Sequence, residues 1–517
     1  MRIAVRTDAS NQIGTGHVMR CLTLAQALRE RGAECRFVCR EHPGNLIALV
    51  REQGFETGVL PLGEQGTKEG SGPEEAVLAH GHWLGSDWCH DAEATIEALE
   101  GTAPDWLIVD HYALDARWES ALRPHVGRIM VIDDLADRPH DCDLLLDQNL
   151  VADMAHRYDG KLPEHCGRML GPEYALLQPQ YADLHSRTPP REGPVQRALI
   201  YFGGADSENL TGRAIDAFVS LQREDVALDV VINPRSLHAD AVREQVRGQL
   251  NITLHQGVPS LAPLMVKADL SIGAGGATTW ERCCLGLPTL ISTLAENQKP
   301  IAAELDARGL ARWLGHQDEV DEARLAQAME ELTASALPHA WSEDCQRVVD
   351  GKGTERVSSI LLLDAQTPLR ARLARVDDEA LILKWANDPL VRQNAFVKGA
   401  IDRVTHRAWF RKRLRDLENC RFYVVETGDA LPVGQVRFEC TNEGWEIHYA
   451  LDSRQRGRGL GVPLVRTALE AARRAVPLDG LFGRVKPENH ASRKVFHTLG
   501  FNEEVAATEL IYREANG

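Results

Sequence analysis

The first part of the chain alternates short apolar runs with segments of helical period. Residues 3–5 form an apolar run, and a polar loop containing glycine follows it. Beyond that loop, apolar residues recur at three- and four-residue steps up to a glycine: Val18, Cys21, Leu22, Ala25, Leu28 and then Gly32. This order predicts a strand, a glycine turn and a helix that ends at Gly32.

Later apolar runs end abruptly in polar residues. The runs within 105–115, 128–138 and 142–149 all do so, which is typical of parallel strands with ligand-facing carboxyl ends. A proline-rich joint at 185–194 precedes a second series, with strand, turn and helix at 197–218, a strand at 227–233 and another such unit at 269–292. Residues 62–73 read as an exposed loop, and 320–363 read as helical.

The pattern changes after Leu369. Helical periods at 380–393 and 403–417 precede three apparent antiparallel strands at 421–427, 434–442 and 444–452. A glycine-rich loop then opens a helix over 454–475, and a strand, turn and helix follow at 480–501. The chain is therefore predicted to be α/β, with two Rossmann-like domains (1–185 and 186–366) and a mixed α+β domain (367–517).

Charge supports a boundary near 365–370. The 517 residues, enough for two or three domains, carry a formal net charge of −17. From Leu369 onward, 25 Lys and Arg face 20 Asp and Glu, a net of +5, so the remainder carries −22. An acidic chain is a poor binder of nucleic acid, whereas a mildly basic domain suits a small phosphorylated cofactor.

The sequence indicates less about the cellular compartment and the oligomeric state. No apolar run is long enough for a membrane span, and the start lacks a secretory pattern. Eleven cysteines, without a CxxC pair, suggest reduced and mostly buried thiols in a cytoplasmic protein. The sequence does not determine the oligomeric state.

Glycine turns before helices mark candidate anion sites. In the first, Gly14 and Gly16 lead to His17, which either caps the turn or acts as a base beside a bound phosphate or sugar. Asp110 and Tyr112, at a strand's carboxyl end, are candidate sugar contacts or orienters of His17.

The second half carries two more such turns. Gly203 and Gly204 lie in one, and Gly275 and Gly276 open the helix of Thr278 and Glu281. Their backbone N–H groups can hold a diphosphate, and a carboxylate one turn into the helix can accept both ribose hydroxyls. Otherwise Glu281 is an exposed helix residue. Asn297 and Gln298 belong to a further polar segment that follows a strand.

Residues 1–363 resemble a known family in four motifs. GTGHVMRCLTLAQAL, DWLIVDHYALD, IDDLADR and GAGGATTWERCCLGLPTLISTLAENQ together look like the PseG-type UDP-sugar hydrolases of pseudaminic acid biosynthesis. These belong with the MurG-like proteins of GT-B fold. The resemblance implies hydrolysis of UDP-2,4-diacetamido-2,4,6-trideoxy-β-L-altropyranose with inversion, with His17 as general base. A metal is not expected, although His80, His82, Cys89 and His90 are close in sequence.

Residues 370–515 resemble the GNAT acetyltransferases. RQRGRGLG and KPENHASRKVFHTLGF match the two signatures of that family, which implies acetyl-CoA as co-substrate. The cofactor-binding positions implied are Leu451, Arg456, Gly457, Arg458, Gly459, Gly461 and Asn489. Where many members carry a tyrosine as general acid, this chain has Phe496. Glu439 and Glu446 are candidate bases or water-holders, or else ordinary strand carboxylates.

The two resemblances together suggest consecutive reactions. A PseH-like domain would acetylate UDP-4-amino-4,6-dideoxy-N-acetyl-β-L-altrosamine, and the hydrolase would release the free sugar and UDP. The alternatives are a GT-B glycosyltransferase fused to an acetyltransferase for another nucleotide amino-sugar or a protein N-terminus, and a non-catalytic UDP-sugar-binding regulator.

Overall fold

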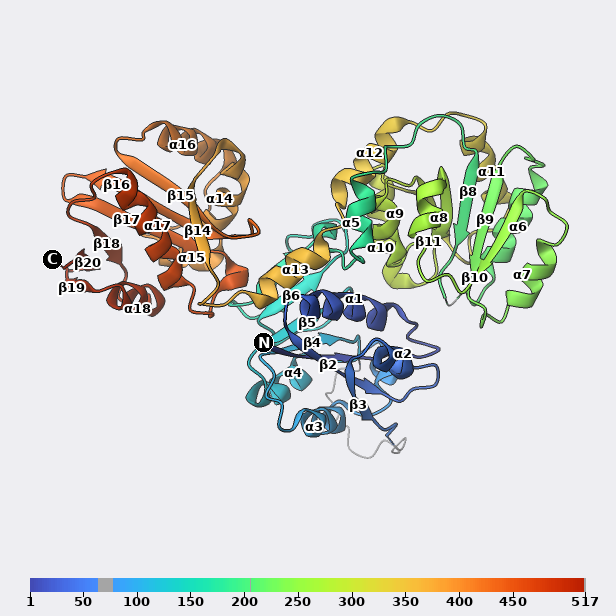
Figure 1. Cartoon of the computed structure of the whole chain (residues 1–517), viewed down its shortest axis with the longest axis horizontal. Helices are drawn as coiled ribbons and strands as arrows, with labels where there is room; N and C mark the ends of the chain where they lie inside the picture. Colours follow the sequence, from blue (N-terminus) through green and yellow to red (C-terminus); the bar gives the residue numbers. More distant parts are fainter. Residues whose placement is uncertain (64–77, 205, 516–517) are drawn as a thin grey trace. The chain divides into compact units, whose positions relative to one another are not determined.

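The computed structural model describes residues 1–63, 78–204 and 206–515 (Figure 1). Most of the loop predicted at 62–73 lies outside these residues. The chain divides into two compact units, one made of 1–163 and 169–358, the other of 164–168 and 359–517. No helix of the described residues is long and apolar enough to cross a membrane.

The first domain is a seven-stranded sheet in the order β3-β2-β1-β4-β5-β6-β7. Its strands are β1 (Arg2–Thr7), β2 (Glu34–Arg40), β3 (Glu56–Leu60), β4 (Trp106–Asp110), β5 (Ile129–Ile132), β6 (Leu144–Asp147) and β7 (Gly167–Leu170). Its helices are α1 (Gly16–Glu30), α2 (Ile47–Glu52), α3 (Trp88–Leu99) and α4 (Ala116–Leu122). The helix α5 (Gln180–His185) follows β7 and packs, through Tyr181, in a core of the second domain.

The order of this sheet has a switch point between β1 and β4. Both strands pair in parallel, so their carboxyl ends lie at one edge, where open α/β sheets bind ligands. The predicted helix begins at Gly16 and ends at Glu30, two residues before Gly32, whose φ of +87° favours glycine. The glycine turn of His17 therefore follows the strand at the switch point.

The second domain has a six-stranded parallel sheet in the order β10-β9-β8-β11-β12-β13. The strands are β8 (Arg197–Tyr201), β9 (Ala227–Ile232), β10 (Ile252–Gln256), β11 (Leu270–Ala274), β12 (Thr289–Thr293) and β13 (Arg312–His316). The helices are α6 (Leu210–Ser220), α7 (Ala239–Gln245), α8 (Ala262–Lys267), α9 (Thr278–Cys284), α10 (Lys299–Ala307), α11 (Glu322–Thr333), α12 (His339–Val348) and α13 (Gly353–Leu362).

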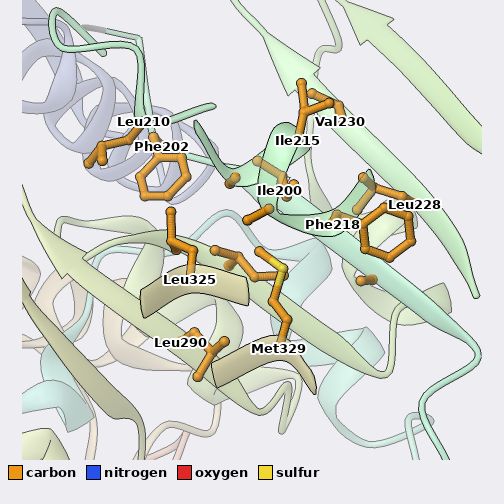
Figure 2. Packing of buried hydrophobic residues seen from close by; sticks show 14 of the residues in the cluster. Ile200, Phe202, Leu210, Ile215, Phe218, Leu228, Val230, Leu290, Leu325 and Met329 are labelled. Atoms are coloured by element: carbon orange, nitrogen blue, oxygen red, sulfur yellow. The ribbon is translucent and has the colours of Figure 1, made fainter. Parts of the chain in front are cut away.

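Alternate strand residues of this sheet enter two different cores. Ile200 and Val230 pack with α6 and α11 residues such as Phe218 and Met329 (Figure 2). Leu199, the neighbour of Ile200 on β8, packs instead with Trp280 of α9 in the core of the other face. Both faces are therefore buried under helices, as continuous apolar runs of parallel strands predict. Here the switch point lies between β8 and β11.

The third domain is a seven-stranded sheet in the order β14-β15-β16-β17-β18-β20-β19. Its strands are β14 (Leu369–Leu373), β15 (Cys420–Thr427), β16 (Pro432–Thr441), β17 (Gly444–Leu451), β18 (Phe482–Val485), β19 (Phe501–Val505) and β20 (Leu510–Glu514). Its helices are α14 (Glu379–Ala386), α15 (Pro389–Asn394), α16 (Arg403–Arg415), α17 (Gly461–Ala475) and α18 (His490–Thr498). All pairings are antiparallel except that of β17 with β18.

Two local differences from the sequence pattern have clear causes. The helix expected from about Asp91 begins at Trp88, because the Asp87 carboxylate caps the backbone N–H groups of Cys89 and His90. The strand β14 was not predicted, since two of its five residues are arginines that pair with Glu426.

Candidate active sites

His17 lies at the switch point of the first sheet and is almost fully buried. It is the second residue of α1, and its Nδ1 lies 2.6 Å from Oδ1 of Asp110, the last residue of β4. Because the Asp110 carboxylate accepts, Nδ1 carries the proton, and the neutral ring then keeps its lone pair at Nε2. This arrangement suits a base that acts through Nε2.

Arg20 holds Asp110 from one turn further along α1. Its guanidinium donates to both Asp110 oxygens, at 2.6 and 2.7 Å, and to Asp134 at 2.7 Å. Burial opposes the charge of Asp110, but Arg20 and His17 keep its pKa well below the usual range. Asp110 is therefore an anion throughout the working pH range and a fixed acceptor for His17.

Tyr112 contacts the His17 ring and extends the network. The two rings meet edge to face with centroids 4.6 Å apart, and the Tyr112 hydroxyl donates to Asp134 at 2.8 Å. Asn149 donates to the other Asp134 oxygen. Sequence reasoning missed Arg20, Asp134 and Asn149, although the last two follow apolar strands and so carried the signal that singled out Asp110.

Other histidines near this strand have different surroundings. Burial lowers the pKa of His111 to about 3, and its Nε2 lies 3.4 Å from Asp8. His80 packs its ring against Trp83 and Tyr112, with centroids 4.4 and 5.4 Å apart. Among the described residues, no three His, Cys, Asp or Glu side chains are grouped to hold a metal ion.

The glycine turns of the second domain follow β8 and β11, the strands on either side of its switch point. Gly203 has a φ of +94° and open space where a side chain would stand. The first N–H groups of α6 are not available to an anion, because Asp206 accepts from Leu210 and Thr211, and Asn209 accepts from Gly212. The first turn of α6 therefore does not supply the anion donors, and Gly203 and Gly204 remain the residues predicted for that role.

The turn after β11 carries the remaining predicted residues of this domain. Gly275 and Gly276 precede α9, which begins at Thr278 and carries Glu281 in its first turn. Burial raises the pKa of Glu281, and a hydrogen bond from Tyr181 opposes that rise.

Gln298 connects this turn to the polar segment that follows β12. It ends a 3-10 helix (Glu296–Gln298) that also contains Asn297, and it accepts from the Leu294 N–H. Its amide nitrogen lies 3.7 Å from the place of a Cβ on Gly276. The structure thus brings the two polar segments together.

The glycine-rich loop of the third domain joins β17 to α17. Gly457 and Gly459 have φ values of +72° and +73°, Leu451 ends β17 and Gly461 begins α17. The three arginines of the loop all have partners: Arg454 pairs with Asp452, Arg456 donates to Asp388 at 2.6 Å, and buried Arg458 donates to the Ile360 carbonyl of α13. These partners hold the arginine side chains in place around the loop.

The other residues predicted for acetyl transfer differ in their surroundings. Asn489 caps α18 by accepting from the Ser492 N–H. Burial opposes the charge of Glu439, but His448 and Arg437 lower its pKa to about 2, which makes it a weak base. Glu446 lies opposite Glu439 in the register, 3.7 Å from His448 Nε2.

Comparison with known proteins agrees with this division. Residues 369–502 match the acetyltransferase (GNAT) domain. The spore coat polysaccharide biosynthesis protein SpsG of Bacillus subtilis is 28% identical over 366 residues, 70% of this chain and 98% of its own length. The UDP-2,4-diacetamido-2,4,6-trideoxy-β-L-altropyranose hydrolase of Campylobacter jejuni is 26% identical over 212 residues, 41% of this chain.

A further relative, an uncharacterised protein of Methanocaldococcus jannaschii, is 22% identical over 307 residues. The matches span 57% of that protein's length and 63% of the hydrolase's. The fold and the matches together define the class of protein: two Rossmann-like domains are followed by a domain that matches the GNAT acetyltransferases. Within the chain, residues 369–502 match the GNAT domain, and the part before them is similar to SpsG and, over a shorter range, to the hydrolase of Campylobacter jejuni.

Proposed function

We propose that the chain catalyses two consecutive steps on one nucleotide sugar. Its GNAT domain acetylates the 4-amino group of UDP-4-amino-4,6-dideoxy-N-acetyl-β-L-altrosamine, and its GT-B region hydrolyses the product to UDP and the free 2,4-diacetamido-2,4,6-trideoxy sugar. The homology to a hydrolase of that product and the match to an acetyltransferase domain support the pairing. The observation that carries the hydrolytic step is the His17–Asp110 pair at the switch point of the first sheet.

In the hydrolytic step, His17 Nε2 takes a proton from water while the water oxygen attacks the anomeric carbon. Water attacks from the face opposite UDP, so the configuration at that carbon inverts. The bond from the carbon to the phosphate oxygen breaks, and UDP leaves with the electron pair. Asp110 stabilises the imidazolium that forms at His17, and Arg20 holds Asp110 in place. Tyr112, packed against His17, contacts the sugar.

The nucleotide is held mainly by the second domain. The backbone N–H groups of Gly203, Gly204, Gly275 and Gly276 bind the diphosphate and stabilise its developing charge. The Glu281 carboxylate accepts the ribose hydroxyls, with Thr278, Asn297 and Gln298 around it. Gly14 and Gly16 place His17.

In the third domain, the loop from Arg456 to Gly461 binds the pyrophosphate of acetyl-CoA through backbone donors, with Leu451 and Asn489 beside the cofactor. Glu446 is a better candidate than Glu439 for receiving the amine proton through water, since cations hold Glu439 as a stable carboxylate. No metal takes part in either step.

The proposal is tested by incubating the purified chain with the 4-amino UDP-sugar and acetyl-CoA and following products by NMR. We expect an N-acetylated UDP-sugar first and then free diacetamido sugar with UDP, without any acceptor. A requirement for an acceptor would identify the first part as a glycosyltransferase. His17→Ala should stop the second product and leave UDP binding intact, which a regulator without catalysis does not predict.

A further inference from the structure

The sheet of the GNAT domain opens between its two parallel strands. Within the described residues, β17 and β18 pair at a single register position, Glu446 with Phe482. Beyond it β17 continues alongside β16 as far as Leu451, and β18 continues alongside β20 as far as Val485. The two strands therefore part in the direction of the glycine-rich loop.

Tyr449 lies on β17 three residues past that pairing. It is half-buried, and it stands on the same side of the strand as Trp445 and Ile447, which belong to the core under α17 and α18. Its hydroxyl donates to Oγ of Ser492, in the first turn of α18, at 2.9 Å. This bond links the edge of the opening to the helix that Asn489 caps.

Phe496, one turn further along α18, presents no proton to this opening. Its ring is buried and stacks on Tyr512, with centroids 5.1 Å apart. The para carbon of the ring lies 2.3 Å from the place of a Cβ on Gly483, so it abuts the backbone of β18. Tyr449 meets the Phe496 ring edge to face at 6.2 Å and is the tyrosine that joins β17 to α18.

Acetyl transfer creates a need for a proton at the thioester sulfur. The amine nitrogen forms a bond to the thioester carbonyl carbon, the carbon–sulfur bond breaks, and sulfur leaves with the electron pair as a thiolate. We propose that the Tyr449 hydroxyl gives its proton to that sulfur and that Ser492 positions the hydroxyl. This proposal rests on the acetyltransferase function of the domain and not on the identity of the sugar.

The surroundings of Tyr449 suit this role. When the Tyr449 hydroxyl rotates and gives its proton to sulfur, the Ser492 hydroxyl rotates in turn and donates to the phenolate. The phenolate then takes a proton from water. The proton released by the amine passes through water to Glu446 and from there to solvent, so the sum is acetyl-CoA and amine giving amide and CoA thiol. Burial raises the pKa of Tyr449 to about 12, so the hydroxyl carries its proton at neutral pH.

The first test measures acetyl transfer to the 4-amino UDP-sugar. Tyr449→Phe should lower kcat about 100-fold or more, with the KM for acetyl-CoA within about two-fold of wild type. Ser492→Ala, which removes the positioning bond alone, should lower kcat about 10-fold. Tyr423→Phe is the matched control, since Tyr423 is buried in the same core on β15 and should keep wild-type kcat. Unchanged kcat in Tyr449→Phe would overturn the proposal.

The second test needs no amine. CoA is bound to the full chain, and its thiol is titrated by the absorbance of the thiolate. A donor at sulfur stabilises the thiolate, so the thiol pKa should lie about one unit lower in wild type and in Tyr423→Phe than in Tyr449→Phe. Equal thiol pKa values would refute the role of Tyr449. If the amino sugar is not acetylated but the thiol shift is present, the substrate is wrong and the role of Tyr449 stands.

Discussion

A single buried carboxylate, Asp110, fixes both the orientation and the tautomer of His17. Asp110 could be singled out from the sequence because it ends an apolar strand in a polar cluster. Arg20 could not, because an arginine within an amphipathic helix has the same pattern as any exposed residue. Its role follows only from the fold, which brings α1, β4 and the residues after β5 to one place.

Asp110→Asn should lower the kcat of hydrolysis about 100- to 10,000-fold while UDP binding is kept. An amide can donate to Nδ1 of His17, which then places the ring proton on Nε2 and removes the base. Product release followed by NMR and UDP binding followed by calorimetry measure the two effects. Asp134→Asn is the matched control: it leaves the His17–Asp110 bond and should cost about 10-fold or less. Equal losses of kcat in both variants would contradict a larger role for Asp110 than for Asp134.

Asp147 predicts a pH dependence of stability. This carboxyl is fully buried at the end of β6, and burial together with the nearby charge of Asp134 raises its pKa from 3.8 to about 7. The folded protein therefore binds a proton that the unfolded chain has lost above about pH 4. The stabilisation is complete below that pH and is lost as pH rises through about 7.

Asp147→Asn resembles the protonated form at every pH. Its free energy of unfolding should match wild type near pH 4 and exceed it increasingly toward pH 8, as measured by urea denaturation. Asp143→Asn, a partly exposed carboxylate on the preceding loop, should show no such growth. A difference between Asp147→Asn and wild type that does not vary with pH would contradict the buried proton.

At the scale of elements, the glycine inside β11 and the glycine in the turn after it have separable functions. A Cβ on Gly273 would lie 2.3 Å from the Tyr201 carbonyl of β8, whereas one on Gly276 would meet only Gln298, at 3.7 Å. Gly273→Ala should therefore destabilise the fold by about 1–3 kcal/mol. Gly276→Ala should keep the melting temperature within about 2 °C and weaken UDP binding by crowding the turn. Thermal unfolding and calorimetry distinguish the two, and equal melting temperatures would contradict the assignment.

Most elements could be predicted wherever hydrophobic period and burial agree. The parallel strands of the first two domains are apolar because both faces are covered, and they were recognisable for that reason. β14 and β19 are polar edge strands whose register depends on partners distant in sequence, so local period does not identify them. For the candidate sites, the glycines and strand ends were predictable, while Tyr449 was not, since its partner is on another element.

At the scale of the whole molecule, the two activities should be separable. His17 and Tyr449 lie in different compact units, so changes at one should not alter the chemistry of the other. His17→Ala should accumulate the acetylated UDP-sugar at wild-type rate, and Tyr449→Phe should hydrolyse supplied acetylated UDP-sugar at wild-type rate. Separate assays with each substrate check this, and a loss of both activities in either variant would show that the two sites are coupled.

The single register position between β17 and β18 has a consequence for the motions of the third domain. Past that position the sheet is two ribbons, one of β14 to β17 and the other of β18, β20 and β19, held together by side chains. Amide hydrogens along this line should exchange faster than those within either ribbon. A ligand that occupies the opening would contact both ribbons, so its binding should slow amide hydrogen exchange in β17 and in β18 together.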